Sequence, residues 1–169
     1  MDFLDKIFWG NTVEDWGIAV LIIVGALVVN KLIRLLHDGV LKKIAARSKS
    51  QFDDILLDAL EKPVMLGVIL GGVWFAAENL EMSNRIRGII EAAYRILIVL
   101  NITWFASKFA TSLVSEYGVR INSRLIPLMK RTVLVVIWVI GIVTALNNVG
   151  VQIATILGVL SVCGVSVAL

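Results

Sequence analysis

Long apolar stretches separated by short polar segments run through the whole chain. The pattern predicts helical membrane spans near residues 16–36, 63–80, 89–114 and 132–149, and a fifth at 150–169. A helix needs about 20 predominantly apolar residues to cross the hydrocarbon core of a bilayer. The expected fold is therefore all-α, an integral membrane protein with about five transmembrane helices.

The final stretch, residues 150–169, carries no charge and mixes Gly, Ala, Ser and Cys with Val, Ile and Leu. Membrane helices that approach one another closely use small side chains so that their backbones can touch. Helical spacing places on one stripe, in order, Ala154, Gly158, Ser161, Val165 and Ala168, and on a neighbouring stripe Ser161, Gly164 and Ala168. This composition fits a ring of identical helices around an axis and equally an interior helix of a single-chain bundle.

The longest polar segment, residues 37–62, predicts a short surface helix ahead of the second span. Ser50 and Asp53 have the Ser-x-x-Asp spacing of a helix N-terminus, followed by an apolar run. Pro63 would then open the second span, because proline is well suited to the first turn of a helix.

The composition indicates a membrane protein and argues against several classes of function. The chain is 59% hydrophobic and 17% charged, with a mean hydropathy of +0.90, outside the range of soluble domains. One Cys excludes an internal disulfide, and one His among scattered acids predicts no metal site. No stretch places a nucleophile beside a base, so we expect no enzyme, no cofactor and no nucleic-acid partner.

The basic residues predict the orientation in the membrane. With the N-terminus outside, 11 of the 16 Lys and Arg residues lie in inside loops or their flanks. These are Lys31, Arg34, Lys42, Lys43, Arg47, Lys49, Lys62, Arg120, Arg124, Lys130 and Arg131. Only Lys6, Arg85 and Arg87 lie outside. The positive-inside rule therefore places the C-terminus in the cytoplasm.

Residues 149–169, Val-Gly-Val-Gln-Ile-Ala-Thr-Ile-Leu-Gly-Val-Leu-Ser-Val-Cys-Gly-Val-Ser-Val-Ala-Leu, resemble the pore-lining helix of the MscS family of mechanosensitive channels. Matched position by position, Gly164 falls on the glycine before the first apolar pore ring, Val165 on that ring and Leu169 on the second. The first ring is usually Leu in the family and is Val here. The family continues into a cytoplasmic domain, so we expect the chain to be the membrane part of a longer protein.

The resemblance implies a weakly selective channel that opens under membrane tension and releases ions and small osmolytes on osmotic shock. It further implies a symmetric homo-oligomer, expected to be a heptamer, in the bacterial inner membrane. Residues 150–169 would line the pore, residues 132–149 would pack beside it, and residues 1–131 would face lipid and sense tension. Val165 and Leu169 would form an apolar collar that excludes water when the channel is closed. Lys42, Lys43 and Arg47 would attract anionic lipid headgroups at about 1 kcal/mol each.

Two other classes remain open. A multi-span transporter would need a polar site at mid-depth, for which Arg95 and Asn101 are the candidates. However, Glu91 and Arg95 are four residues apart and can pair with each other on one helix face. A membrane scaffold subunit is also compatible with the composition.

Overall fold

The computed structural model describes residues 7–37, 39, 51–118 and 125–151 of the chain. A short antiparallel hairpin, β1 (Ile7–Phe8) and β2 (Asn11–Thr12), precedes the helices. The helices are α1 (Val13–Leu36), α3 (Gln51–Glu78), α4 (Asn84–Gly118) and α5 (Ile126–Asn148). Apart from the hairpin, regular structure in these ranges is helical, which confirms the predicted all-α class.

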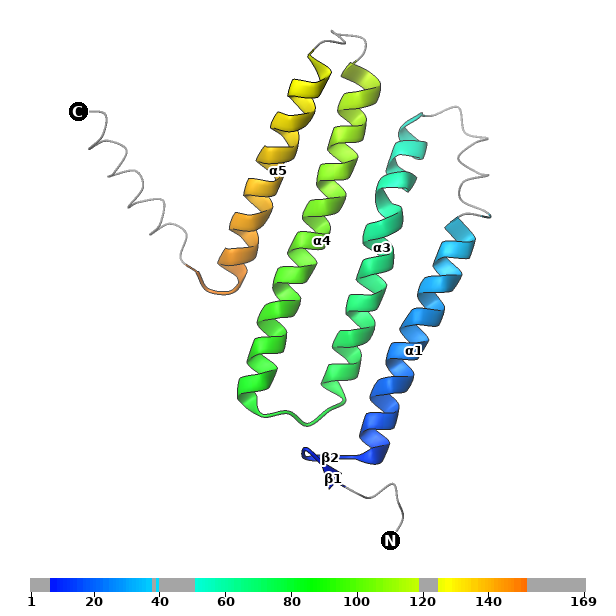
Figure 1. The fold of residues 1–169 in the computed structure, drawn as a ribbon, viewed down its shortest axis with the longest axis vertical. Helices are drawn as coiled ribbons and strands as arrows, with labels where there is room; N and C mark the ends of the chain where they lie inside the picture. The colour runs from blue at the N-terminus through cyan, green and yellow to red at the C-terminus, as the bar shows by residue number, and fades with distance from the viewer. Residues whose placement is uncertain (1–6, 38, 40–50, 119–124, 152–169) are drawn as a thin grey trace, which may run out of the picture.

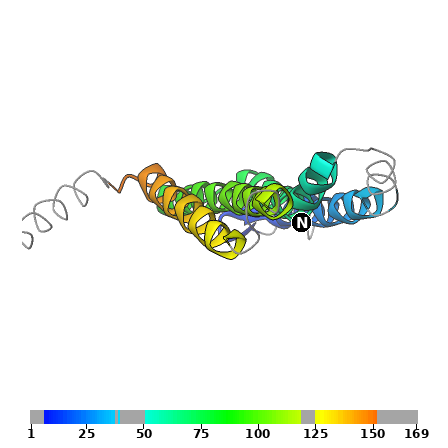
Figure 2. The ribbon, with the colours of Figure 1, turned by 90° about the horizontal axis from the view of Figure 1, so that it is seen from above.

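The four helices lie side by side in chain order, in a single layer (Figure 1). Seen from above they form one row, and only neighbours in that row make extensive contacts (Figure 2). The end of α1, the start of α3, the end of α4 and the start of α5 share one edge of the layer. The hairpin and the turn between α3 and α4 lie at the opposite edge. Among the described helices, none covers either broad face of the layer.

Small residues make the helix-to-helix contacts. Ala19 of α1 and Ala76 of α3 are buried together, and the backbone of α3 at Gly72 lies against Ala26 of α1. In α5, Gly141 receives the buried side chain of Thr103 from α4. Side chains this small let helix backbones approach closely, which is how helices associate where lipid removes the hydrophobic driving force between them.

Three of the described helices, α1, α4 and α5, are long and apolar enough to cross a membrane. The prediction of five spans is therefore wrong in its count, because α3 does not qualify and residues 152–169 lie outside the described residues. In α3 the uncharged stretch runs only from residue 63 to 77, between Lys62 and Glu78. At about 1.5 Å per residue it covers about 22 Å of a hydrocarbon core about 30 Å thick.

The structure also corrects the prediction for Pro63. Instead of opening a new helix, Pro63 lies inside α3, which runs unbroken for 28 residues from Gln51 to Glu78. The predicted surface helix and the predicted second span are thus one element. Proline removes one backbone donor and crowds the preceding turn, so an interior proline needs compensation from neighbouring groups.

The first transmembrane helix begins at a well-defined cap. The Thr12 hydroxyl accepts a hydrogen bond from the Asp15 backbone N–H at 3.2 Å, and the Asp15 carboxylate accepts one from the Thr12 N–H at 2.8 Å. This reciprocal pair satisfies two backbone donors that a helix N-terminus leaves free. The hairpin just before it turns at Trp9 and Gly10, which both have positive φ angles of 56° and 86°. For Trp9 that conformation costs about 1–2 kcal/mol.

Candidate functional site

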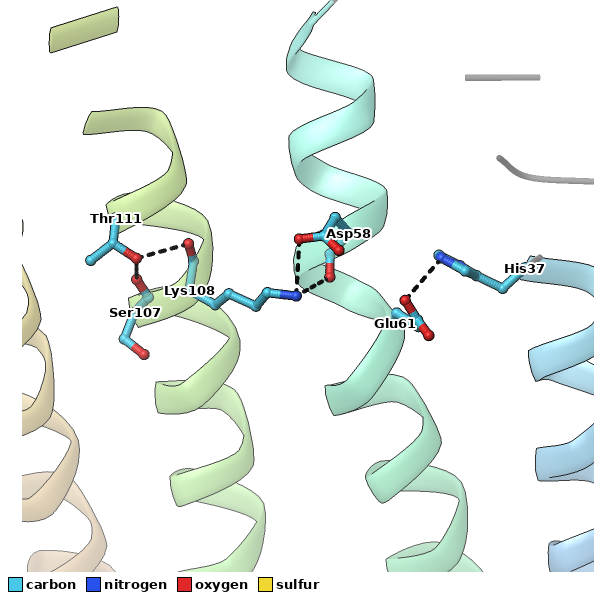
Figure 3. Close-up of polar contacts among 6 residues, drawn as sticks. All are labelled: His37, Asp58, Glu61, Ser107, Lys108 and Thr111. Carbon is cyan, nitrogen blue, oxygen red and sulfur yellow. Dashed lines mark hydrogen bonds and ion pairs between the residues drawn. The ribbon is translucent and has the colours of Figure 1, made fainter. Parts of the chain in front are cut away.

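Ionisable side chains lie between three helices near the edge of the layer where α1 ends. His37, at the end of α1, lies with Nε2 3.3 Å from a carboxylate oxygen of Glu61 in α3. One helical turn earlier in α3, Asp58 faces α4 and pairs with Lys108, Nζ to Oδ2 being 3.0 Å (Figure 3). His37 is 6% and Glu61 19% exposed at the side chain. The three helices are therefore linked by ionisable groups at one level.

Lys108 makes a second contact that relates to the proline. Its ammonium donates a 2.6 Å hydrogen bond to the backbone carbonyl of Asp58, five residues before Pro63. An interior proline disturbs the hydrogen-bond ladder of the preceding turn. The carbonyl that Pro63 leaves without an intrahelical donor belongs to Ala59, so the bond from Lys108 to Asp58 holds α4 against this part of α3 but does not replace the missing one.

Asn101 of α4 makes a further contact with α3, at Pro63 itself. Its amide donates to the carbonyl of Pro63 at 2.9 Å, and the residue is 9% exposed. Gly67 lies on the facing turn of α3; a Cβ there would be 3.5 Å from the Asn101 amide nitrogen, an ordinary van der Waals contact. Asn101, considered as a transport residue from sequence, is thus engaged in packing α4 against α3.

Aromatic contacts extend this seam between α3 and α4 towards both edges. Phe52 packs edge-on against Phe109, with ring centroids 5.6 Å apart. Trp74 stacks on Tyr94 at 4.5 Å. Rings in such offset or edge-on pairs contribute about 0.5–1.5 kcal/mol beyond the area they bury. The seam is therefore fixed at several levels along α3.

At the opposite edge of the layer, a polar contact joins the hairpin to the turn after α3. The side chain of Asn11 is 3% exposed. Its amide donates to the backbone carbonyl of Glu81 at 3.0 Å, and its oxygen accepts from the Glu81 N–H at 2.5 Å. A buried amide with both ends satisfied fixes the relative position of two segments 70 residues apart in sequence.

The predicted pore and lipid residues all lie outside the described residues. For the pore these are Val165 and Leu169 with the packing residues Ala154, Gly158, Ser161, Gly164 and Ala168. For the headgroup contacts they are Lys42, Lys43 and Arg47. Their roles stay predictions. Across the described ranges, no three His, Cys, Asp or Glu side chains are grouped as a metal ion would require.

One pairing expected from spacing is confirmed. Arg95 and Glu91 form an ion pair at 3.4 Å on an exposed face of α4. The links through Asp58, Lys108 and Asn11 were not predicted from sequence. A lysine and an asparagine inside an apolar stretch, together with a proline inside a long helical pattern, were the signals that could have indicated them.

Comparison with known proteins shows to which proteins this chain is similar. The chain is 26% identical over 175 residues to the large-conductance mechanosensitive channel MscMJLR of Methanocaldococcus jannaschii, and the match covers 98% of the chain. It is 28% identical over 169 residues, 95% of the chain, to the small-conductance mechanosensitive channel MscMJ of the same organism. The chain is a homologue of mechanosensitive channels. This finding confirms the resemblance to the MscS family that residues 149–169 indicated, and extends it to almost the whole chain.

Each relative is longer than the part that matches. The match covers 48% of each relative, so the chain spans about half the length of the curated relatives it matches. No family model and no solved structure matches it. The relatives are channels and not enzymes, as the sequence predicted. The chain is a multi-pass membrane protein; because the relatives are archaeal, a bacterial inner membrane stays a prediction.

Proposed function

We propose that the chain is the membrane part of an ion channel that opens under membrane tension. The observation that carries the proposal is its similarity to two mechanosensitive channels across 95–98% of its length. The single layer of helices supports it, because a layer with two open faces suits assembly with further copies or contact with lipid. In the described residues, Arg95 pairs with Glu91 and the amide nitrogen of Asn101 donates to Pro63, while the buried Asn101 oxygen has no hydrogen-bond partner.

In this proposal residues 150–169 of several subunits surround the pore, and the ring is a heptamer. Rings of Val165 and Leu169 form an apolar constriction that closes the channel by excluding water. Ala154, Gly158, Ser161, Gly164 and Ala168 let neighbouring pore helices pack closely and move past one another. No charged residue lies in residues 150–169, so selectivity among ions is weak.

The helix layer α1, α3 and α4 carries the response to tension. Tension favours whichever state occupies more membrane area, and moving from 1% to 99% open requires about 5.5 kcal/mol of differential free energy. The polar and aromatic contacts between α1, α3 and α4 let these helices move together, so small displacements in the lipid can reach α5. Lys42, Lys43 and Arg47 hold the cytoplasmic edge near anionic headgroups.

The distribution of charges supports an orientation with the edge at His37 in the cytoplasm. Basic residues flank that edge in every described helix, namely Lys31, Arg34, Lys62, Lys108, Lys130 and Arg131. At the other edge the described helices and turns carry only Arg85 and Arg87, while acidic residues lie at both edges and do not distinguish them. Positive residues are retained on the cytoplasmic side during membrane insertion.

Patch recording from liposomes that contain the complete protein tests the proposal. Stepped suction should produce discrete openings, and Val165→Ser or Leu169→Ser should lower the threshold, since a hydroxyl ring hydrates the constriction more easily. The conservative variant Val165→Ile serves as the matched control and should keep the parental threshold or raise it. Absence of any tension-dependent current in parent and variants would refute the channel, and concentration-driven uptake would then indicate a transporter.

A further inference from the structure

The tip of the N-terminal hairpin is the most exposed large apolar feature of the described residues. Trp9 is 91% exposed, and the strand before it presents Ile7 at 72% and Phe8 at 55%. Register pairs Ile7 with Thr12 and Phe8 with Asn11, so Trp9 and Gly10 form a two-residue loop. Both have positive φ, the conformation of a type I′ turn, where Asn-Gly is the preferred sequence.

Tryptophan is an unfavourable choice at that position. A bulky side chain is strained at positive φ, and an indole that projects into water leaves a large apolar surface solvated. The Trp9 carbonyl accepts a hydrogen bond from the Asn11 amide at 3.4 Å, but the residue is 91% exposed, so the described protein does not cover the indole. Strained residues that persist in a structure point to a function of the strained group. The strained, exposed indole therefore points to a partner that the described residues do not supply.

The hairpin is firmly held. Asn11 bonds to both backbone groups of Glu81, in the turn that leads from α3 to α4. The Trp16 indole donates to the carbonyl of Phe8 at 3.2 Å, and Thr12 caps α1. These hydrogen bonds fix the hairpin, with its exposed side chains, between the start of α1 and the α3–α4 turn.

The position of the hairpin in the sequence indicates that the partner of Trp9 is the lipid interface. The candidate span α1 starts at Val13, directly after the hairpin, so the hairpin lies at the level where the bilayer meets water. Tryptophan is enriched at that level because its ring is apolar and its N–H is polar. The carboxylates of Glu14 and Asp15 adjoin the hairpin and would keep it from entering the hydrocarbon core.

We propose that the hairpin inserts Trp9, flanked by Ile7 and Phe8, into the interfacial region of the lipid leaflet on its side of the membrane, and that Asn11 transmits the position of this anchor to the α3–α4 turn. The insertion depends only on the chain being a membrane protein. Its influence on opening rests on the proposed function.

Fluorescence quenching in vesicles of zwitterionic lipid tests the insertion. Trp74, Trp104 and Trp138 are replaced by Phe in the complete protein, and Trp9→Asn is compared in that background so that the difference isolates the Trp9 signal. Asparagine suits the turn and removes the indole, while Trp16 and its hydrogen bond to Phe8 are kept. We expect the difference signal to be blue-shifted, insensitive to aqueous iodide, and quenched more by lipid brominated near the headgroup than by lipid brominated deep in the chains.

Two outcomes would overturn the proposal. Quenching by iodide without quenching by brominated lipid would place Trp9 in water. Protection from both quenchers would place it against protein, either a second copy of the chain or a separate partner. Circular dichroism of both variants establishes that the helices are retained, so that a changed signal reports the location of Trp9.

The proposed coupling between Trp9, Asn11 and channel opening is tested by a separate measurement. Under stepped suction, Trp9→Asn and Asn11→Ala should shift the tension of half-opening in the same direction, because one removes the anchor and the other its connection. Trp9→Tyr keeps an interfacial aromatic ring and should restore the parental value. An unchanged threshold with confirmed insertion would refute the coupling through Asn11, whereas absence of tension-gated current in the parent would refute the proposed function and leave the insertion result intact.

Discussion

Two neighbouring glycines of α3 have different surroundings. A Cβ on Gly72 would overlap the Cβ of Ala26 in α1, while a Cβ on Gly71 would meet nothing within 4 Å. Gly72 is therefore required for the close approach of α1 and α3, and Gly71 is not required for any contact within the described chain. Their adjacent positions in one helix make them a matched pair for an experiment.

We predict that Gly72→Ala lowers the stability of the protein and Gly71→Ala does not. Overpacking of a tight contact costs about 1–3 kcal/mol, whereas alanine in an open helical position gains up to about 1 kcal/mol in helix propensity. Thermal unfolding in detergent, followed by circular dichroism, measures both. Equal shifts in the two variants would show that α1 and α3 do not meet at Gly72.

Asn101 provides a second prediction at this scale. Asn101→Ala removes the hydrogen bond to the Pro63 carbonyl and should lower stability by about 0.6–2 kcal/mol, the range for polar contacts between membrane helices. Asn79→Ala is the control, since the exposed Asn79 amide, just after α3, donates to the Phe75 carbonyl four residues earlier in the chain. A variant of Asn101 that is as stable as the control, but that abolishes solute uptake, would instead indicate a transport residue.

At the scale of the helices, α3 is the element that depends most on its neighbours. It contains Pro63, and its uncharged stretch is shorter than that of a typical span. Two side chains of α4 donate to the backbone of α3: Lys108 to the carbonyl of Asp58, five residues before the proline, and Asn101 to the carbonyl of Pro63 itself. These bonds hold α3 against α4 around the proline, although neither accepting carbonyl is the one, at Ala59, that Pro63 deprives of its intrahelical donor.

The two contacts of Lys108 can be separated by mutation. Asp58→Asn removes the ion pair but leaves the bond from Lys108 to the backbone carbonyl, so we expect a loss of at most about 1 kcal/mol that high salt abolishes. Lys108→Met removes both contacts and should cost more, with a part that salt does not affect. Unfolding measured at low and high salt tests this, and identical losses in both variants would contradict the role of the carbonyl bond.

Hydropathy located all four described helices, because alternation of apolar and polar segments reflects transfer into lipid, which depends on each segment alone. It did not locate their ends or their partners. Pro63 was assigned to a helix start because that is its best local position, whereas the contacts that hold α3 at Pro63 and Asp58 come from α4, 38 and 50 residues further along the chain. The links Asn11 to Glu81 and Asp58 to Lys108 likewise depend on which helices become neighbours, which local pattern does not encode.

At the scale of the whole molecule, the layer leaves most of its large apolar side chains exposed. In α1 and α5, for example, Leu21 is 70% and Ile140 is 60% exposed. Lipid or other subunits must cover such a surface, since in water each exposed Å² of apolar area costs about 25 cal/mol. Such a surface is what the proposed tension-gated channel would present to the surrounding membrane.

Solute release from liposomes tests tension gating most directly. Vesicles containing the complete protein are loaded with a small fluorescent anion and diluted either into a medium of equal osmolarity or into one of low osmolarity, with the same gradient of the anion in both. We predict rapid release only after the osmotic step, because only that step stretches the membrane. Equal release without swelling would contradict tension gating and would show that concentration alone drives transport through this protein.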